Sequence, residues 1–555
     1  MYEQQHYNDP QKNGGAYAQG GYYGQQPPQY YGQPQAYAQP YAMPQPQPTQ
    51  HTYGDNGNAQ EVNAIKPEKA PEGACRDLPF AVLFIANVVA IVALMVMWGL
   101  DAIKDDDDTT LTSSKSKNQF LTPKETKNTI AISLGMAVLA VVLSLLSVKL
   151  ITAYARCMIT FTLWFNVGIS FAIAGLGFAI GNMFLGIIGA ILALIGLCYA
   201  RAVMHRIPFA VANLRVAAAA ISKHWSTYIV AIMFTIIQIA WVVVWALAFL
   251  GVANELKTEG SGSKAVGEVC SASSDCVSNY CIYYGGSPYR RCSNAASGFK
   301  NASATSYVAY FFMVLSFYWG LQVFKNVPHT TIAGTVATFW YNAESSGATG
   351  SSLRRSMTTS FGSICFGSLL VAIIQALREL AQQAQQEGNF LACIADCLLS
   401  CLQSIVEYIN RWAYVYVGIY GYKFTQAGKA VFELFNQRGF DAIINDDLIG
   451  NVLGFAAFAI GLICAGAGAV IANYTDLVEF SNSTIFLAVL GLFIGIGVAI
   501  TPLSVVDSSV ATIFVCFAED PAAFAQAHPD LYNPLVTEWH NLYPEIMVQA
   551  GYWHA

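Results

Sequence analysis

Charged residues are scarce in this chain. Asp, Glu, Lys and Arg make up 11% of its 555 residues, less than half the usual share, whereas apolar residues make up 55%. The formal net charge is −6, and the sequence has no concentrated cluster of basic residues. The electrostatic signature of a nucleic-acid-binding protein is therefore absent. This composition is typical of an integral membrane protein, and we expect no nucleic-acid partner.

Sequence signatures of common enzymes are also absent. The chain contains neither a G-x-S-x-G nucleophile elbow nor an H-E-x-x-H zinc motif. Ala427-Gly428-Lys429 lacks the preceding glycine pattern of a phosphate-binding loop, so ATP-driven transport is not expected from this chain alone. We therefore expect no enzymatic activity and no cofactor.

Leu, Ile, Val and Phe are almost missing from residues 1–75, which consist mainly of Gln, Tyr, Pro, Gly and Ala. Such a segment cannot bury enough apolar surface to fold, so we expect a disordered cytosolic tail. Because Met1–Gln60 contains no apolar core segment, we expect no cleavable signal peptide and a first span that acts as its own signal.

The tail contains one short motif, Pro27-Pro28-Gln29-Tyr30. P-P-x-Y sequences bind WW domains as a polyproline II turn, so this motif predicts a WW-domain ubiquitin ligase as a partner. The alternative is that a tail this rich in Pro and Tyr produces the pattern by chance.

Long apolar runs fill the rest of the chain. Several reach 18 residues or more, enough for a helix to cross the bilayer core of about 30 Å. The predicted spans are 80–100, 129–148, 158–180, 183–200, 227–252, 307–324, 360–377, 390–422, 449–472 and 484–506. We therefore expect an all-α, polytopic membrane protein with about ten transmembrane helices, a transmembrane domain over 76–508 and a cytosolic C-terminal stub over 509–555.

Sequons test the predicted topology. A cytosolic start places both termini in the cytosol and the loops 101–127, 253–304, 378–390 and 473–483 outside. The chain has three N-x-S/T acceptors, at Asn301, Asn473 and Asn482, and all three fall on these outside loops or at their edges. We therefore predict glycosylation at these asparagines.

The outside loop 253–304 contains an even number of cysteines: Cys270, Cys276, Cys281 and Cys292. This loop has no apolar core of its own, and disulfides stabilise such segments outside the cell. A zinc site is the alternative, but the spacing lacks paired C-x-x-C knuckles. We predict two disulfides, whose pairing the spacing leaves open.

Two stretches are distinctive enough to indicate a family. They are NRWAYVYVGIYGYKFTQAGKAVFELFNQRGFDAIINDDLIGNVL, from Asn410 to Leu453, and NVPHTTIAGTVATFWY, from Asn326 to Tyr341. Both resemble the choline transporter-like family, also called solute carrier family 44, and in particular its fungal branch, the pH-nine-sensitive proteins. The resemblance extends over roughly residues 76–521.

The resemblance implies a plasma-membrane solute transporter, facilitative or gradient-driven, for choline or another small organic cation. Alternating access around a site near the bilayer midplane is the expected mechanism. A membrane scaffold that does not transport, and whose tail and loops recruit partners, is the alternative function.

A quaternary ammonium ion is usually bound by aromatic faces with a carboxylate nearby. The candidate aromatic residues are Trp241, Trp245, Tyr310, Tyr318, Trp319 and Tyr414, and the candidate carboxylates are Asp396 and Glu407, both within an apolar run. The alternative for each aromatic residue is a place in the helix packing or at the lipid interface.

Other ionisable residues favour structural roles. Arg378, Glu379 and Asp507 lie near predicted helix ends, which indicates snorkelling or capping. Cys393, Cys397 and Cys401 recur every four residues; we interpret them as small packing residues, with a metal or redox site as the alternative, and predict no metal site. One residue of the pair Asp446 and Asp447 is predicted to cap the ninth span, with cation binding as the alternative.

Overall fold

The computed structural model describes residues 74–99, 123–255, 268–271, 281–283, 290–292, 304–344, 346–386, 390–438, 448–475, 477 and 482–549. Several predictions lie outside these residues: the N-terminal tail with Pro27, Pro28 and Tyr30, the cysteine Cys276, the sequon at Asn301, and the acidic pair Asp446 and Asp447.

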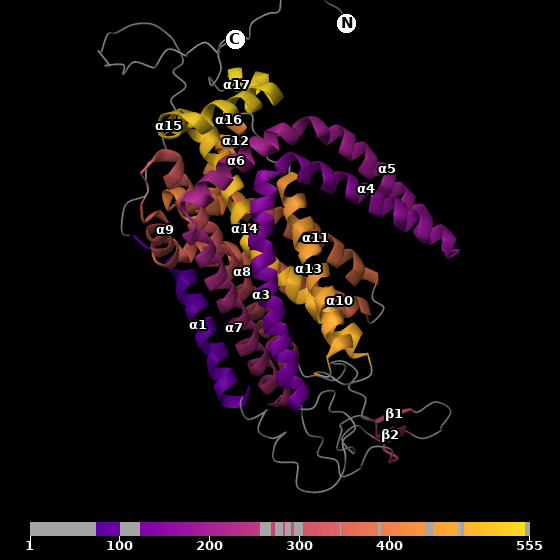
Figure 1. Ribbon diagram of the computed structural model, residues 1–555. Coiled ribbons are helices and arrows are strands. Elements are labelled where there is room, and N and C mark those ends of the chain that lie inside the picture. Colours follow the sequence, from indigo (N-terminus) through magenta and orange to yellow (C-terminus); the bar gives the residue numbers. More distant parts are fainter. Residues whose placement is uncertain are drawn as a thin grey trace, which may run out of the picture. The chain divides into compact units, whose positions relative to one another are not determined.

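Long helices form almost all of the described structure, and many of them run side by side (Figure 1). They are α1 (Leu78–Leu94), η1 (Met95–Gly99), α3 (Pro123–Ala153), α4 (Ala155–Ala179), α5 (Met183–Val203), η2 (Met204–Arg206), α6 (Ile207–Lys223), α7 (Ser226–Glu255), α8 (Ala304–Tyr341), α9 (Ala348–Met357), α10 (Phe361–Gln386), α11 (Phe390–Tyr420), α12 (Phe424–Arg438), α13 (Leu448–Tyr474), α14 (Ser483–Glu519), α15 (Pro521–Ala527), α16 (Pro529–Leu542) and α17 (Pro544–Gln549). Within the described residues, 10 segments are long and apolar enough to cross a membrane. The predicted all-α, ten-span architecture is confirmed.

Three helices extend nine or more residues beyond the predicted ends of their spans. Helix α8 continues through Pro328 to Tyr341, and α14 continues through Pro502 to Glu519, so the predicted domain boundary after residue 508 falls inside a helix. Helix α10 continues through polar sequence to Gln386, nine residues beyond the predicted end of its span. Hydropathy reports which residues suit lipid, whereas helices also extend where their neighbours are protein or water.

Small residues set the closest helix contacts. In the hairpin of α4 and α5, a Cβ added at Gly177 would lie 2.4 Å from the backbone of Gly186, and one at Gly189 would lie 2.7 Å from the backbone of Ala174. In the pair α13 and α14, a Cβ added at Gly468 would lie 2.3 Å from the carbonyl oxygen of Leu487. Membrane helices associate through such close approach because lipid removes the hydrophobic drive between them.

The start of α1 is joined to two other helices, α10 and α12, and to the residues just before α10. One carboxylate oxygen of Asp77 accepts hydrogen bonds from the Ser363 hydroxyl at 2.7 Å and from the backbone N–H of Phe424 at 2.9 Å. The backbone N–H of Arg76 donates to the carbonyl oxygen of Thr359 at 2.8 Å. These bonds fix the first residues of α1, α10 and α12 against one another.

The C-terminal helices α15 to α17 form an ordered cap against α6 and α8. The Trp539 ring stacks on Phe517 with centroids 4.0 Å apart, and Trp340 stacks on Phe524 at 4.1 Å. The Trp340 indole also donates to the backbone oxygen of Asp520 at 2.9 Å. The predicted C-terminal stub is therefore a packed extension of the helix bundle.

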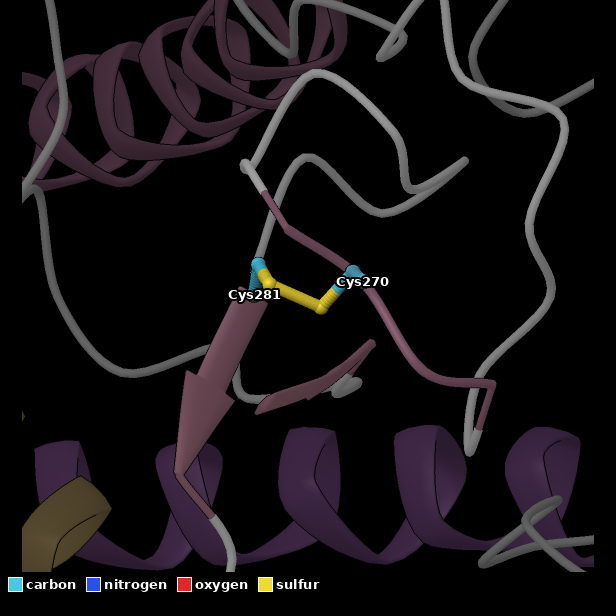
Figure 2. Close-up of a disulfide and its surroundings, with 2 residues drawn as sticks. All are labelled: Cys270 and Cys281. Carbon is cyan, nitrogen blue, oxygen red and sulfur yellow. A yellow bond between two sulfur atoms is a disulfide. The ribbon is translucent and has the colours of Figure 1, made fainter. Parts of the chain in front are cut away.

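The cysteine-containing loop forms a small antiparallel hairpin of β1 (Cys281–Tyr283) and β2 (Arg290–Cys292). Figure 2 shows the disulfide that joins Cys270 to Cys281 beside this hairpin. Cys292 is disulfide-bonded as well. Disulfides, and not zinc, therefore involve the three cysteines of this loop that the structure describes.

The α13–α14 contact predicts that Gly468→Ala destabilises the protein. The added methyl group would overlap the Leu487 carbonyl and should reduce the free energy of unfolding by about 1–3 kcal/mol. Gly466→Ala is the matched control, because a Cβ at Gly466 of the same helix meets nothing within 4 Å. The test is the thermal unfolding midpoint of each variant in detergent, and equal midpoints would contradict the packing described here.

His224 lies between α6 and α7, and its lowered pKa predicts that the stability of the protein falls on acidification. Burial lowers the pKa of its imidazole below the usual 6.5, and the neighbouring Lys223 lowers it further. The unfolded chain therefore binds the proton more tightly, so the free energy of unfolding falls as the pH drops through about 6.5. Between pH 7.5 and pH 5.5, the unfolding midpoint of the wild type should fall more than that of His224→Gln; equal falls would refute this role.

Candidate functional site

A polar stripe runs along helix α11. Asp396, Ser400, Gln403, Glu407 and Arg411 follow one another at intervals of three or four residues, and at about 100° per residue they share an arc of roughly 80°. The opposite face is apolar and exposed, and it consists of Leu391, Ile394, Leu398, Leu402 and Ile405. Helix α11 therefore presents one face suited to lipid and one suited to protein or water.

Helix α10 supplies partners for this stripe. The Arg378 guanidinium forms an ion pair with Asp396, with Nε and Oδ1 3.0 Å apart, and its Nη1 donates to the Gln403 amide oxygen at 2.7 Å. Gln403 in turn donates to Glu407 at 2.8 Å, and Gln382 donates to Asp396 at 3.2 Å. One arginine thus connects two carboxylates of α11, the first directly and the second through an amide.

The polar contacts continue from α10 to α8. The Tyr318 hydroxyl donates to Glu379 at 3.4 Å, and the Gln322 amide donates to the Gln375 amide oxygen at 3.2 Å. We call these residues, together with Asp396, Gln403 and Glu407 of the α11 stripe, the polar seam; its members are Tyr318, Gln322, Gln375, Arg378, Glu379, Gln382, Asp396, Gln403 and Glu407.

The polar seam carries an excess of negative charge. Glu379, Asp396 and Glu407 contribute three carboxylates, whereas Arg378 contributes the one cation. The side chains of Arg378 and Asp396 keep 26% and 22% of their surface exposed. Because a charged group facing hydrocarbon is costly, this exposure indicates contact with water and not with lipid.

The polar seam extends deep into the membrane span. At 1.5 Å per residue, Asp396 lies about 9 Å and Glu407 about 26 Å along α11 from Phe390. Arg411 follows Glu407 by one turn, and its Nη2 forms an ion pair with Asp507 of α14, 2.6 Å from Oδ1. Charged side chains therefore follow α11 from near one end of the span to near the other.

His329 links α8 to this second ion pair. Its Nε2 lies 3.0 Å from the backbone oxygen of Arg411, and its Nδ1 lies 2.7 Å from the Ser508 hydroxyl oxygen. Because a carbonyl oxygen can only accept, Nε2 donates this hydrogen bond. In the neutral ring, Nδ1 then accepts from Ser508, so one imidazole joins α8, α11 and α14.

Beyond these charges, tyrosines and a carboxylate fill the ends of α8, α11 and α14. The hydroxyls of Tyr416 and Tyr420 lie close to the Glu519 carboxylate, and Tyr420 also lies close to Tyr341. The Tyr416 and Tyr420 rings lie 5.1 Å apart, and Tyr416 is 2% exposed. This tyrosine cluster, composed of Tyr341, Tyr416, Tyr420 and Glu519, is partly buried: Tyr416 is enclosed by the helices, whereas Tyr341 is 39% exposed.

The predicted site residues do not form one cage. Tyr318, Asp396 and Glu407 belong to the polar seam. The indole N–H groups of Trp241 and Trp245 donate to backbone oxygens of α8, at 3.3 Å and 2.9 Å.

Of the three remaining predicted aromatic residues, Trp319 and Tyr414 hydrogen-bond to the backbone, whereas Tyr310 lies close enough to Glu379 of the polar seam to interact with it electrostatically. The Trp319 indole donates to the carbonyl oxygen of Cys365 at 3.0 Å. Tyr414 is 1% exposed and donates to the carbonyl oxygen of Ile364 at 3.1 Å. Tyr310 packs near Phe249, with ring centroids 6.3 Å apart. These contacts place Trp319 and Tyr414 in the helix packing.

The remaining predictions have simpler outcomes. In the part of the chain that the structure describes, no three His, Cys, Asp or Glu side chains are close enough to bind a metal. Cys393, Cys397 and Cys401 are exposed on α11. Asn473 and Asn482 lie near the adjoining ends of α13 and α14, where the Thr484 hydroxyl donates to the Asn473 amide oxygen at 3.0 Å.

Sequence comparison identifies the family. A family model described as plasma-membrane choline transporter matches residues 187–522, more than half of the chain. The chain belongs to the choline transporter-like family. This is a family of transporters, and the resemblance carried by the stretches at residues 326–341 and 410–453 is confirmed.

Relatives of this choline transporter-like chain include proteins of the fungal branch. Protein PNS1 of Mycosarcoma maydis is 36% identical over 269 residues, which cover 46% of this chain and 50% of that protein. A CTL-like protein of Dictyostelium discoideum is 30% identical over 402 residues, covering 71% and 63%. Protein PNS1 of Eremothecium gossypii is 27% identical over 534 residues, covering 90% and 87%. The chain thus spans about half to two thirds of the length of the first two relatives.

The interaction between Arg378 and Asp396 can be measured in this choline transporter-like protein. Arg378→Gln and Asp396→Asn should each reduce the free energy of unfolding, because each leaves a partly buried charge without its partner. The double variant should lose less than the sum, with a coupling of about 1 kcal/mol, since both side chains retain solvent contact. Unfolding free energies in mixed micelles provide the test, and additive losses would refute the ion pair.

Proposed function

We propose that this protein is a solute carrier that moves a small organic cation, such as choline, across the plasma membrane by a facilitative or gradient-driven mechanism. The observation that carries this proposal is the polar seam, a water-exposed row of charged groups along a helix of membrane-spanning length. A helix that only anchors a scaffold has no need of such groups, because each one is costly at membrane depth.

The charge of the polar seam suits a cation. Three carboxylates against one guanidinium attract a positive solute, and Arg378 already neutralises Asp396. Glu407 accepts a hydrogen bond from the neutral amide of Gln403 and has no ion-pair partner among the described residues. Glu407 is therefore the residue we assign to the cation, with Tyr318 supplying an aromatic face.

Alternating access gives the polar seam and the tyrosine cluster different roles. The two groups lie at different levels of α11, and Tyr416 of the tyrosine cluster is buried between helices, so we assign the tyrosine cluster to a gate at that end of the path. Transport would require α8, α11 and α14 to separate at Glu519 while α10 and α11 close over the polar seam. The prolines at 328 and 502 interrupt the backbone hydrogen bonds of α8 and α14 close to His329 and Ser508, where such bending would be absorbed.

The orientation that we propose puts the tyrosine cluster and both termini in the cytosol. The disulfide beside β1 and the sequons at Asn473 and Asn482 support this, because disulfides persist and glycans are added on the opposite side. The divisions 1–75, 76–508 and 509–555 are retained as functional regions. The WW-domain partner of Pro27, Pro28 and Tyr30 stays a prediction.

Uptake of labelled choline into vesicles that contain the purified protein tests the function. Glu407→Gln should lower the initial rate about tenfold, equivalent to about 1.4 kcal/mol of binding to the cation. Glu433→Gln is the matched control, because it removes an exposed carboxylate of α12 and should leave the rate within about twofold of wild type.

Two outcomes would overturn the proposal. If the folded protein takes up neither choline nor any other organic cation, the scaffold alternative is favoured. If uptake occurs but Glu407→Gln matches Glu433→Gln, the cation does not follow the polar seam.

A further inference from the structure

A cavity of about 600 Å³ opens beside the first turns of α4, away from the polar seam. Its lining consists of Arg156, Cys157, Thr160, Phe161 and Trp164. Arg156, Thr160 and Trp164 are spaced by four residues and therefore lie on one face of the helix. This cavity, which we call the α4 groove, combines a cation at one end with aromatic side chains at the other.

The aromatic end of the α4 groove is open. Phe161 and Trp164 are 49% and 41% exposed. Phe161 and Phe165 also pack against Phe455 of α13, with centroid distances of 5.7 Å and 4.9 Å, which attaches this part of α4 to the bundle. The groove therefore has a wall fixed to the rest of the protein and an apolar lining available to a ligand.

The cationic end lies where α4 begins. Arg156 is exposed and, among the described residues, has no carboxylate partner. Tyr154 is the N-cap residue of this 25-residue helix and makes no side-chain capping hydrogen bond, and the first N–H groups of the helix face the same end as Arg156. The Thr160 hydroxyl donates its hydrogen bond to the Arg156 backbone oxygen at 2.8 Å and is therefore not available to donate to a ligand. The guanidinium and the helix end are thus the groups that can hold an anion.

The surrounding sequence has one sign of charge. No Asp or Glu occurs between Glu125 and Glu255, a stretch that includes all of α4, α5 and α6. Lys149 lies near the C-terminal end of α3, before the break at Tyr154, and Arg201 lies on α5. The contacts of Gly177 with Gly186 and of Ala174 with Gly189 set an antiparallel register that brings Arg201 level with Thr162, beside the α4 groove.

The position of the α4 groove matches a membrane lipid. The apolar span of α4 starts at Ala155, so Arg156 lies at its boundary, and Trp164 lies about 12 Å further along the helix. A phospholipid has a phosphate at the boundary and an acyl chain at that depth. Lys149, Arg156 and Arg201 have no acidic residue near them in the sequence, and this favours a lipid headgroup with a net negative charge. Basic pockets between membrane helices bind anionic headgroups for the same reason.

We propose that the α4 groove binds one anionic phospholipid, with its phosphate at Arg156 and an acyl chain along Phe161 and Trp164. The site is separate from the proposed transport path and does not depend on it.

Native mass spectrometry of the full-length protein with added phosphatidylserine tests the site. One bound lipid should survive detergent removal in the wild type, whereas Arg156→Gln should weaken binding about tenfold, the loss of one charge-assisted contact. Arg354→Gln is the matched control, because it removes an exposed arginine from α9, outside the groove. It should bind phosphatidylserine as the wild type does.

Two further measurements distinguish the contribution of the acyl chain from that of the headgroup. Trp164→Ala should also weaken binding, and its unfolding midpoint checks that the variant is folded. Glycerophosphoserine, which has the headgroup without acyl chains, should not compete at equal concentration; if it does, the groove binds a free phosphate ester and the lipid proposal fails. The proposal also fails if phosphatidylcholine binds equally well, or if Arg156→Gln and Arg354→Gln behave alike.

Discussion

The ion pair between Arg378 and Asp396 is the interaction on which the arrangement of α10 and α11 depends. A carboxylate at membrane depth needs a cation or water, and the guanidinium meets this need while also holding Gln403 in contact with Glu407. Helix α11 turns its charged face toward α10 and its apolar face outward as a result. This pair, with the hydrogen bonds of Gln382 and Gln403, favours that orientation of α11 about its axis.

The apolar runs were sufficient to predict the number and order of the spans, because a segment that crosses lipid must be apolar for about 20 residues. They were not sufficient to predict where helices end. Residues 378–386 are polar and were expected to form a loop, yet they continue α10 because α11 offers them polar partners and not lipid. The same reasoning applies to Pro328 in α8 and Pro502 in α14, which are tolerated inside helices whose neighbours surround them.

Only part of the candidate site was predicted, because the helix ends were not. Asp396 and Glu407 stand out in an apolar run, so the sequence alone marks them as candidates. Arg378 and Glu379 were assigned to a helix end, and only the extension of α10 brings them to the carboxylates of α11. A signal for the polar seam was present in the spacing of Asp396, Gln403, Glu407 and Arg411, which repeats with the helical period. Trp241 and Trp245 could not be distinguished from cage residues, because their role depends on which backbone oxygens lie within reach of each indole.

The contacts at the start of α1 have a consequence for biosynthesis. Asp77 lies near the beginning of the part of the chain that the structure describes, but Phe424, whose N–H donates to its carboxylate, is translated 347 residues later. At about 5–20 residues per second, that interval is roughly 17–70 s. Throughout it, the first span resides in the membrane without the full set of hydrogen bonds to this carboxylate, so these contacts are completed only when the ribosome has passed the start of α12. An insertion factor or chaperone would have that long to act on the nascent chain.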